Sequence, residues 1–331
     1  GVPTTRALAA SLTGETVWRE GGKPGAVLAR VASSHLRVGT FQFFASRGET
    51  DRLRQLADYA IARHFPDLTG SEGRYLQLLT RVCDAQARLI AQWVNLGFVH
   101  GVMNTDNVAI SGETIDYGPC AFIDAYDPKA VFSSIDRNGR YAYGNQPNIA
   151  QWNLARFAES LLDLIDPEDS DAAIAKATEA LNQFPQHYQA AWLKGVRAKL
   201  GLMKDLPGDL DLANDLLAMM AESRADFTQT FRSLSDVVRG SEAAFRDRFL
   251  DLAAIDPWLG RYGERTTRED IPTNARTAAM DRANPIYIPR NHKVEEALEA
   301  AEAGNLAPFD TLLKAITSPF EAREGFEAYA A

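Results

Sequence analysis

Apolar residues recur every three or four positions between residues 75 and 96. This spacing places them on one continuous face of a helix of about six turns. Gly97 follows as a C-terminal stop, because glycine readily adopts the left-handed conformation that ends helices. We therefore predict a long helix that buries one face in a core. The residues of this face are Tyr75, Leu79, Val82, Ala85, Leu89, Trp93 and Leu96.

The segment directly after this helix, residues 98–107, is dense in polar groups. Residues 108–110 and 113–115 are predicted to form two short antiparallel strands, joined by a two-residue turn at Ser111 and Gly112. The sequence thus predicts a polar loop at the open end of a hairpin.

The register of this hairpin indicates a metal site. Pairing outward from the turn places Asn107 directly opposite Asp116, with their Cβ atoms about 5 Å apart and Asp106 beside them. Amide and carboxylate oxygens suit Mg²⁺ or Mn²⁺, which take one or two protein side chains plus phosphate oxygens and water. The alternative is structural: Asp106 and Asn107 cap the hairpin, and Asp116 begins a turn.

Protein kinases arrange the same parts in the same order: a long helix, a His-containing loop, an Asn metal ligand, a hairpin and Asp-Phe-Gly. Here His100 opens the loop, Asn107 takes the Asn position, and residues 116–118 read Asp-Tyr-Gly. Val102 stands where kinases have their catalytic Asp, which leaves Asp106 as the carboxylate of the loop. We expect His100 to orient the loop through a backbone hydrogen bond rather than to act in catalysis.

The rest of the chain predicts an α+β fold. Residues 5–19 and 25–32 are predicted strands around a glycine-rich turn at 21–25, which lacks the Gly-Lys-Ser/Thr ending of a P-loop. We expect a nucleotide- and metal-binding core over residues 1–166 and a helical region over 167–331. Within the core, an irregular stretch is predicted from after residue 119 to about residue 148. Helices are predicted over 53–64, 152–165, 172–184, 187–200, 209–220, 227–237 and 294–303.

Charge and composition exclude several classes of protein. The chain has 44 acidic and 35 basic residues, so we expect no broad surface for nucleic acid. No apolar run approaches the ~20 residues that span a bilayer, and no signal pattern opens the chain. Two isolated cysteines, Cys83 and Cys120, favour a reduced, cytoplasmic protein. The start at Gly1 suggests a piece of a longer protein.

Long motifs across the chain resemble the SelO/YdiU family. They include the His100 loop, in which Asp106 rather than residue 102 supplies the carboxylate, and the Asp-Tyr-Gly segment at 116–118. The matching segments are residues 1–8, 30–41, 100–107, 113–120, 139–147, 152–156, 284–285 and 287–292.

This resemblance implies a kinase-like (pseudokinase) fold, mostly the helical lobe with a few strands of the N-lobe, followed by an all-helical region. It implies inverted ATP binding and metal-dependent transfer of AMP to Ser, Thr or Tyr hydroxyls of protein substrates. By motif, Asp106 would be the general base, and Asn107 and Asp116 the ligands of Mg²⁺ or Mn²⁺. Arg30 and Arg37 would contact the phosphates of the nucleotide.

Family members carry a Gly-rich loop, a Lys and its Glu partner upstream of the part matched here, and a redox motif downstream. We therefore expect this chain alone to bind ATP weakly. Three alternatives stay open: a protein uridylyltransferase that uses UTP and Mn²⁺, a catalytically silent nucleotide-binding scaffold, and an ordinary phosphotransferase. The last would require an Asp in place of Val102.

Overall fold

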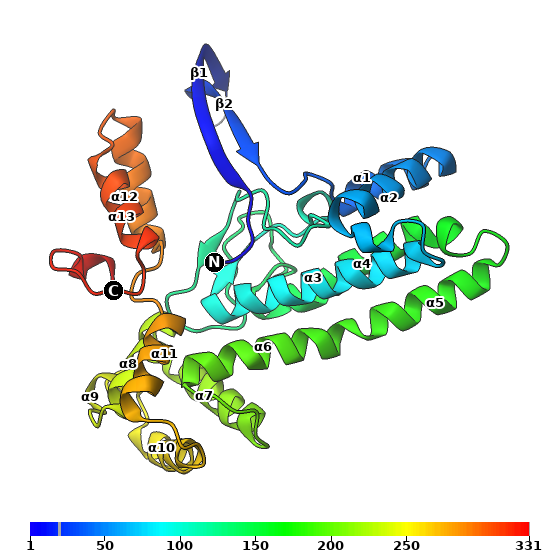
Figure 1. The fold of residues 1–331 in the computed structure, drawn as a ribbon. Coiled ribbons are helices and arrows are strands. Elements are labelled where there is room, and N and C mark those ends of the chain that lie inside the picture. Colours follow the sequence, from blue (N-terminus) through cyan, green and yellow to red (C-terminus); the bar gives the residue numbers. More distant parts are fainter. Residues whose placement is uncertain (19–20, 331) are drawn as a thin grey trace. The chain divides into compact units, whose positions relative to one another are not determined.

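The computed structural model describes residues 1–18 and 21–330, which form helices and two small antiparallel sheets (Figure 1). The chain divides into two compact units, each built from separate stretches of sequence. The predicted boundary at residue 166 stays a prediction. The first unit comprises Gly1–Ile90, Met103–Tyr117 and Pro147–Tyr188, and the second Ala91–Val102, Gly118–Gln146 and Gln189–Ala331.

The first unit opens with a long antiparallel hairpin of β1 (Arg6–Trp18) and β2 (Gly22–Val31). Two strands are therefore confirmed, although residue 19 of the predicted first strand lies outside the described residues. The predicted hairpin is confirmed, but the predicted bounds of its turn, 21–25, are wrong, because β2 already begins at Gly22. A Cβ at Gly25 would lie 2.8 Å from the Thr13 side chain, so this glycine allows close approach at an irregularity of the ladder.

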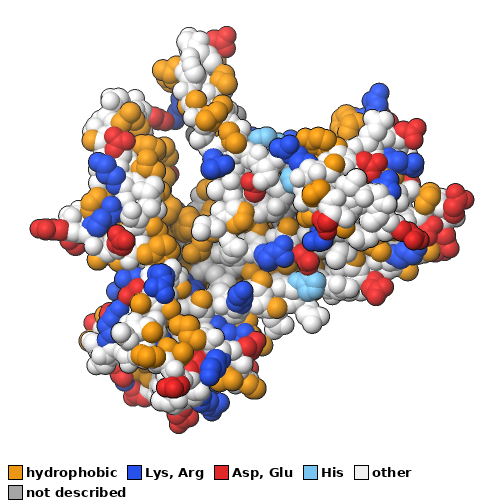
Figure 2. Space-filling model, viewed as in Figure 1, with side chains coloured by type: hydrophobic (Ala, Val, Ile, Leu, Met, Phe, Trp, Pro, Cys, Tyr) orange, Lys and Arg blue, Asp and Glu red, His pale blue; other side chains and the backbone are white. Residues whose placement is uncertain are grey.

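Several large apolar side chains are exposed on this hairpin, and Figure 2 shows apolar patches among its polar surface. Trp18 is 80% exposed and Leu12 is 76% exposed, so the hairpin contributes little to the core of the unit. The residues just before β1 and just after β2 instead pair with the segments around the candidate site.

Helices form the core of the first unit. α3 is confirmed over Arg74–Leu96, with Gly97 in the left-handed conformation (φ 73°), and its residues up to Ile90 belong to this unit. Phe41 of α1 packs edge-on against Phe157 of α4 with ring centroids 4.9 Å apart, and both side chains are fully buried. The other helices of this unit are α1 (Val38–Ala45), α2 (Thr50–His64), α4 (Gln146–Ile165) and α5 (Ser170–Asn182).

Two of these helices differ from the sequence-based expectation. α1 was not predicted, because its eight residues include Gly39 and are too few for a clear apolar period. α4 begins at Gln146, six positions before the predicted start at residue 152, and Pro147 lies in its first turn. Proline fits the first turn of a helix, where its missing N–H costs no hydrogen bond.

The second unit is helical around a minimal sheet of β3 (Phe98–Val99) and β4 (Ala121–Phe122). The predicted helices after residue 182 are confirmed within a few residues at their ends. In the described part of the chain, no helix combines the length and apolar character needed to cross a bilayer. The helices are α6 (Phe184–Leu200), α7 (Asp209–Ser223), α8 (Phe227–Val238), α9 (Ala243–Arg246), α10 (Leu252–Thr267), α11 (Thr273–Ala283), α12 (Asn291–Glu302) and α13 (Ala307–Thr317).

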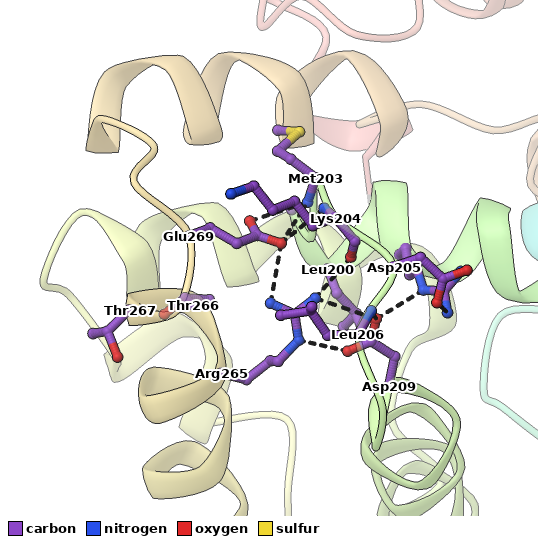
Figure 3. A network of polar contacts seen from close by, with 12 residues as sticks. Leu200, Met203, Lys204, Asp205, Leu206, Asp209, Arg265, Thr266, Thr267 and Glu269 are labelled. Carbon is purple, nitrogen blue, oxygen red and sulfur yellow. Dashed lines mark hydrogen bonds and ion pairs between the residues drawn. The ribbon is translucent and has the colours of Figure 1, made fainter.

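A buried ionic network braces the second unit (Figure 3). Arg265 of α10 donates to the carboxylate of Asp209 at 2.5 Å and to that of Glu269 at 3.0 Å. Glu269 also accepts from the backbone amides of Met203 and Lys204, at 3.0 and 2.8 Å. These bonds tie α7 and the loop before it to α10 and to Glu269 just after it, and they satisfy charges that would be costly to bury alone.

Candidate functional site

The predicted hairpin over residues 108–115 is wrong, because its first arm pairs elsewhere. Arg37 and Ala109 form an antiparallel bridge. The amide of Ile110 donates to the carbonyl of Leu36 at 3.0 Å. This arm therefore extends the segment that leads into α1.

The second arm pairs with the start of the chain. Thr114 forms a parallel bridge with Thr4, and its amide donates to the carbonyl of Pro3 at 2.9 Å. Among the described residues the two arms form no ladder with each other, so Asn107 and Asp116 are not opposed in the predicted register. Both arms take partners from distant parts of the sequence, which local turn chemistry does not indicate.

A single turn of 3-10 helix, Thr105–Asn107, presents the candidate base and metal ligand. Asn104 caps this turn: its Oδ1 accepts from the amide of Asp106 at 3.1 Å, and its carbonyl accepts from the amide of Asn107 at 3.0 Å. Asp106 is exposed and Asn107 is half-buried. The turn thus fixes the backbone of both residues and leaves the Asp106 carboxylate accessible.

Gly39 provides the surface against which this carboxylate lies. A Cβ at position 39 would overlap Oδ1 of Asp106 and lie 3.1 Å from its Cγ. Gly39 belongs to the first turn of α1, two positions after Arg37. The paired segments therefore bring the start of α1 against the Asp106 turn.

Asp116 and Arg30, two of the predicted site residues, lie together. The Asp116 carboxylate is 4.0 Å from the guanidinium of Arg30 in β2, and both side chains are partly exposed. Asp116 adopts a left-handed backbone conformation (φ 64°), which aspartate tolerates better than most residues and which often marks functional sites. The hairpin thus delivers a cation beside the predicted metal ligand.

Arg37 occupies the N-cap position of α1. Its amide donates to Oγ1 of Thr40 at 3.3 Å, which fixes the backbone. Its Nε is buried and has no hydrogen-bond partner in the part of the chain that the structure describes. A buried guanidinium nitrogen without a protein acceptor suits a bound anion, because such groups are normally paired.

In the second unit, His100 has the structural role expected of it. It is fully buried, with its ring 5.3 Å from that of Trp93. Its Nδ1 accepts from the amide of Val102 at 3.4 Å, and its own amide donates to Gln146 at 3.0 Å. These bonds confirm that His100 orients the backbone of its loop.

By the chemistry of its side chains, the predicted donor set would suit a divalent cation and a nucleotide. Asn107 and Asp116 offer hard oxygen ligands, and Arg30 and Arg37 offer planar cations that can each donate to two phosphate oxygens. The described residues contain no group of three or more His, Cys, Asp or Glu side chains that could hold a metal ion. The assigned roles of Asp106, Asn107, Asp116, Arg30 and Arg37 stay predictions.

Three residues that support this site carried no role in the sequence-based prediction. Gly39 makes room for Asp106, Asn104 caps the turn, and the buried Asn153 of α4 binds the carbonyl of Met103. An Asn two positions before an Asp is a capping signal that could have identified Asn104. Gly39 and Asn153 act through tertiary contacts, for which the sequence offers no local signal.

Comparison with known proteins defines the family. The family model described as "Protein adenylyltransferase SelO" matches residues 1–317. A "Protein nucleotidyltransferase YdiU" of Rhizobium leguminosarum bv. trifolii (strain WSM2304) is 54% identical over an alignment of 332 positions, which covers 99% of this chain and 66% of the relative. Proteins of the same name from Mycobacterium sp. (strain KMS) and Chromobacterium violaceum are 56% and 55% identical over all of this chain, covering 67% and 69% of their own lengths.

The chain therefore belongs to the SelO/YdiU family, and the resemblance of its motifs to that family is confirmed. It spans about two thirds of the length of the curated relatives that it matches.

Proposed function

We propose that the protein is a metal-dependent protein adenylyltransferase that transfers AMP from ATP to Ser, Thr or Tyr hydroxyls of protein substrates. The proposal includes a kinase-like fold, inverted binding of ATP and action in the cytoplasm. Family membership supports nucleotidyl transfer, because the matched family model and the relatives are named for it.

The contact of Arg30 with Asp116 carries the proposal for this chain. A guanidinium 4.0 Å from a carboxylate, with both side chains partly exposed, would place a phosphate-binding group beside a metal-binding group. Exposed ion pairs contribute little to stability, so neither side chain is committed to the fold and both can meet a charged ligand. The accessible carboxylate of Asp106 completes the set of groups needed for transfer.

In the proposed reaction the substrate hydroxyl oxygen attacks the α-phosphorus of ATP. Asp106 accepts the hydroxyl proton as the new oxygen–phosphorus bond forms. The bond between the α-phosphorus and the bridging oxygen breaks, and pyrophosphate leaves with the bonding electrons. Arg30 and Arg37 stabilise the charge on the phosphates through charge-assisted hydrogen bonds.

Asn107 and Asp116 would hold the divalent cation, which would supply neutralisation of phosphate charge. Their own contribution is a neutral amide oxygen and a carboxylate, a pair that leaves room for phosphate oxygens and water. The mixed pair carries one negative charge, so it can accept a metal–nucleotide complex without strong repulsion of the phosphates.

The test uses the full-length protein with Mg²⁺ or Mn²⁺ and ATP labelled at either the α- or the γ-phosphate. We expect label on protein only from the α position, and its loss in Asp106→Ala. The matched control is Asp163→Ala, which removes an exposed carboxylate of α4 in the same unit and should retain full labelling. Transfer of the γ label would instead identify a phosphotransferase.

Competition between ATP and UTP distinguishes the nearest alternative. The relatives are named nucleotidyltransferases without a stated nucleotide, which leaves a uridylyltransferase as the second candidate. Preferential transfer of UMP with Mn²⁺ would favour it. Absence of any transfer by a protein that still binds nucleotide would favour the scaffold.

A further inference from the structure

The strongest unassigned polar group near the candidate site is the side chain of Asn153. It lies in the middle of α4 and is fully buried. Its Nδ2 donates to the carbonyl of Met103 at 2.9 Å and to that of Ile149, one helical turn earlier, at 2.9 Å. Burial of an amide side chain in a helix costs free energy unless the amide is hydrogen-bonded, so the carbonyl that it binds outside its own helix indicates its role.

Met103 is the residue directly before the turn that carries the candidate base. It is itself buried, at 1% exposure. From Met103 the chain passes to Asn104, which caps the turn and accepts from the amides of Asp106 and Asn107. Asn153 therefore fixes the backbone where the turn begins.

The other end of the turn is fixed independently. The carbonyl of Val108 accepts from the amide of Val38 at 3.0 Å, and the side chain of Gln86 donates to the carbonyl of Ala109 at 2.7 Å. Without Asn153, the carbonyl of Met103 would lose this bond at the start of the turn. Catalytic groups must be held within fractions of an ångström of their productive positions, so the anchor at Met103 matters for rate.

We propose that Asn153 is a positioning residue, which sets the Asp106 and Asn107 turn through its hydrogen bond to the Met103 carbonyl. The catalytic part of this inference rests on the proposed function. The positioning of the turn does not, and it can be measured without activity.

The chain contains a matched control for this role. Asn95 of α3 makes the same pair of bonds in the second unit: its Nδ2 donates to Ala91, one turn earlier, at 2.9 Å and to the distant carbonyl of Trp192 at 3.1 Å. In both residues Oδ1 has no hydrogen-bond partner among the described residues. Asn95→Leu thus removes an equivalent bond without touching the Asp106 turn.

The experiment compares Asn153→Leu and Asn153→Asp with Asn95→Leu in the full-length protein. Hydrogen exchange at the amides of Asp106 and Asn107 should become at least about tenfold faster in both Asn153 variants and stay unchanged in Asn95→Leu. Transfer of AMP should slow by about 10–100-fold in the Asn153 variants, with a larger change in kcat than in KM for ATP. Asn153→Asp keeps the size of the side chain, so it separates loss of the donor from loss of shape.

The outcomes separate the two claims. Unchanged exchange at Asp106 and Asn107 in the Asn153 variants would overturn the inference, whether or not the protein transfers a nucleotide. Faster exchange with transfer rates equal to those of Asn95→Leu would also overturn it. Faster exchange in a protein whose wild type transfers no nucleotide would refute the proposed function and leave Asn153 as the anchor of the turn.

Discussion

The carboxylate of Asp106 occupies the space over Gly39 in which a β-carbon would stand. The two residues are 67 positions apart, and they meet because residues 36–38 pair with residues 108–110. This contact fixes one side of the candidate base, and it can be tested by restoring the missing carbon.

Gly39→Ala should lower the rate of AMP transfer by about 100-fold, since a shift of about 1 Å in a catalytic group costs this much. The free energy of unfolding should change by less than about 1 kcal/mol, because the carboxylate can turn away and alanine favours the helix. Gly260→Ala, where a Cβ meets nothing within 4 Å, is the control and should keep full activity. A fully active Gly39→Ala protein would refute the proposed role of this contact.

Arg37→Lys should raise KM for ATP by about tenfold, because lysine keeps the charge but loses the planar fork that binds two phosphate oxygens. The buried Nε of Arg37, which has no hydrogen-bond partner among the described residues, is the atom that lysine cannot replace. Steady-state kinetics with Arg88→Lys, an exposed position on α3, provides the comparison. Equal KM values in the two variants would remove Arg37 from the nucleotide site.

Glu269 links the stability of the second unit to acidic pH. Burial alone would raise the pKa of its carboxyl, but hydrogen bonds from the Lys204 and Met203 amides, and then from Arg276 and Arg265, lower the pKa to about 2. The carboxylate therefore stabilises the fold fully above its unfolded pKa of 4.5, by about 3 kcal/mol, and loses this as pH falls toward 2.

Glu269→Gln should lower the free energy of unfolding by about 3–5 kcal/mol at pH 7, since it breaks a buried ionic network. The difference from wild type should shrink as the pH falls from 4.5 toward 2. Chemical denaturation across this range, with the exposed Glu264→Gln as control, measures it. A difference independent of pH would contradict the assigned ionisation.

Because of Lys199, we expect the free energy of unfolding to depend on pH in the alkaline range. Its side chain is buried, with Nζ 4.3 Å from the centroid of Phe231, and burial lowers the pKa of its ammonium to about 7. The unfolded state holds this proton up to about 10.5, so the fold gains stability as pH rises from about 7 toward 10.5.

Lys199→Met should therefore stabilise the protein at and below neutral pH, by about 1–4 kcal/mol, because it removes a buried charge and keeps the volume. The gain should decline as the pH rises above 7. The exposed Lys194→Met variant should show neither effect in the same denaturation series. Destabilisation by Lys199→Met at every pH would show that the contacts of the ammonium with the aromatic rings outweigh its burial.

Local pattern in the sequence was enough to predict most helices. The apolar period of residues 75–96 specified α3 and its end at Gly97, because a long amphipathic helix can bury its stripe in only one way. α1 escaped prediction, since its helical state depends on packing of Phe41 against Phe157, 116 positions away.

In the candidate site, too, local sequence predicts some features and tertiary contacts determine the others. Motif order in the sequence indicates the residues of the site, but the predicted hairpin register is wrong, because Thr114 pairs with Thr4 and Ala109 pairs with Arg37. Backbone pairing between distant segments depends on the whole fold and leaves no periodic trace in either segment. The support of Asp106 by Gly39 could therefore be found only in the structure.

The most direct test of nucleotidyl transfer is the mass of the group attached to a protein hydroxyl. The full-length protein would be incubated with Mg²⁺ or Mn²⁺ and equal concentrations of ATP and UTP, and the modified proteins would be analysed by mass spectrometry. The Asp106→Asn variant would be treated in the same way. We predict AMP on Ser, Thr or Tyr side chains, absent in the variant. A phosphate group, or AMP attached equally by Asp106→Asn, would contradict the assigned reaction or its base.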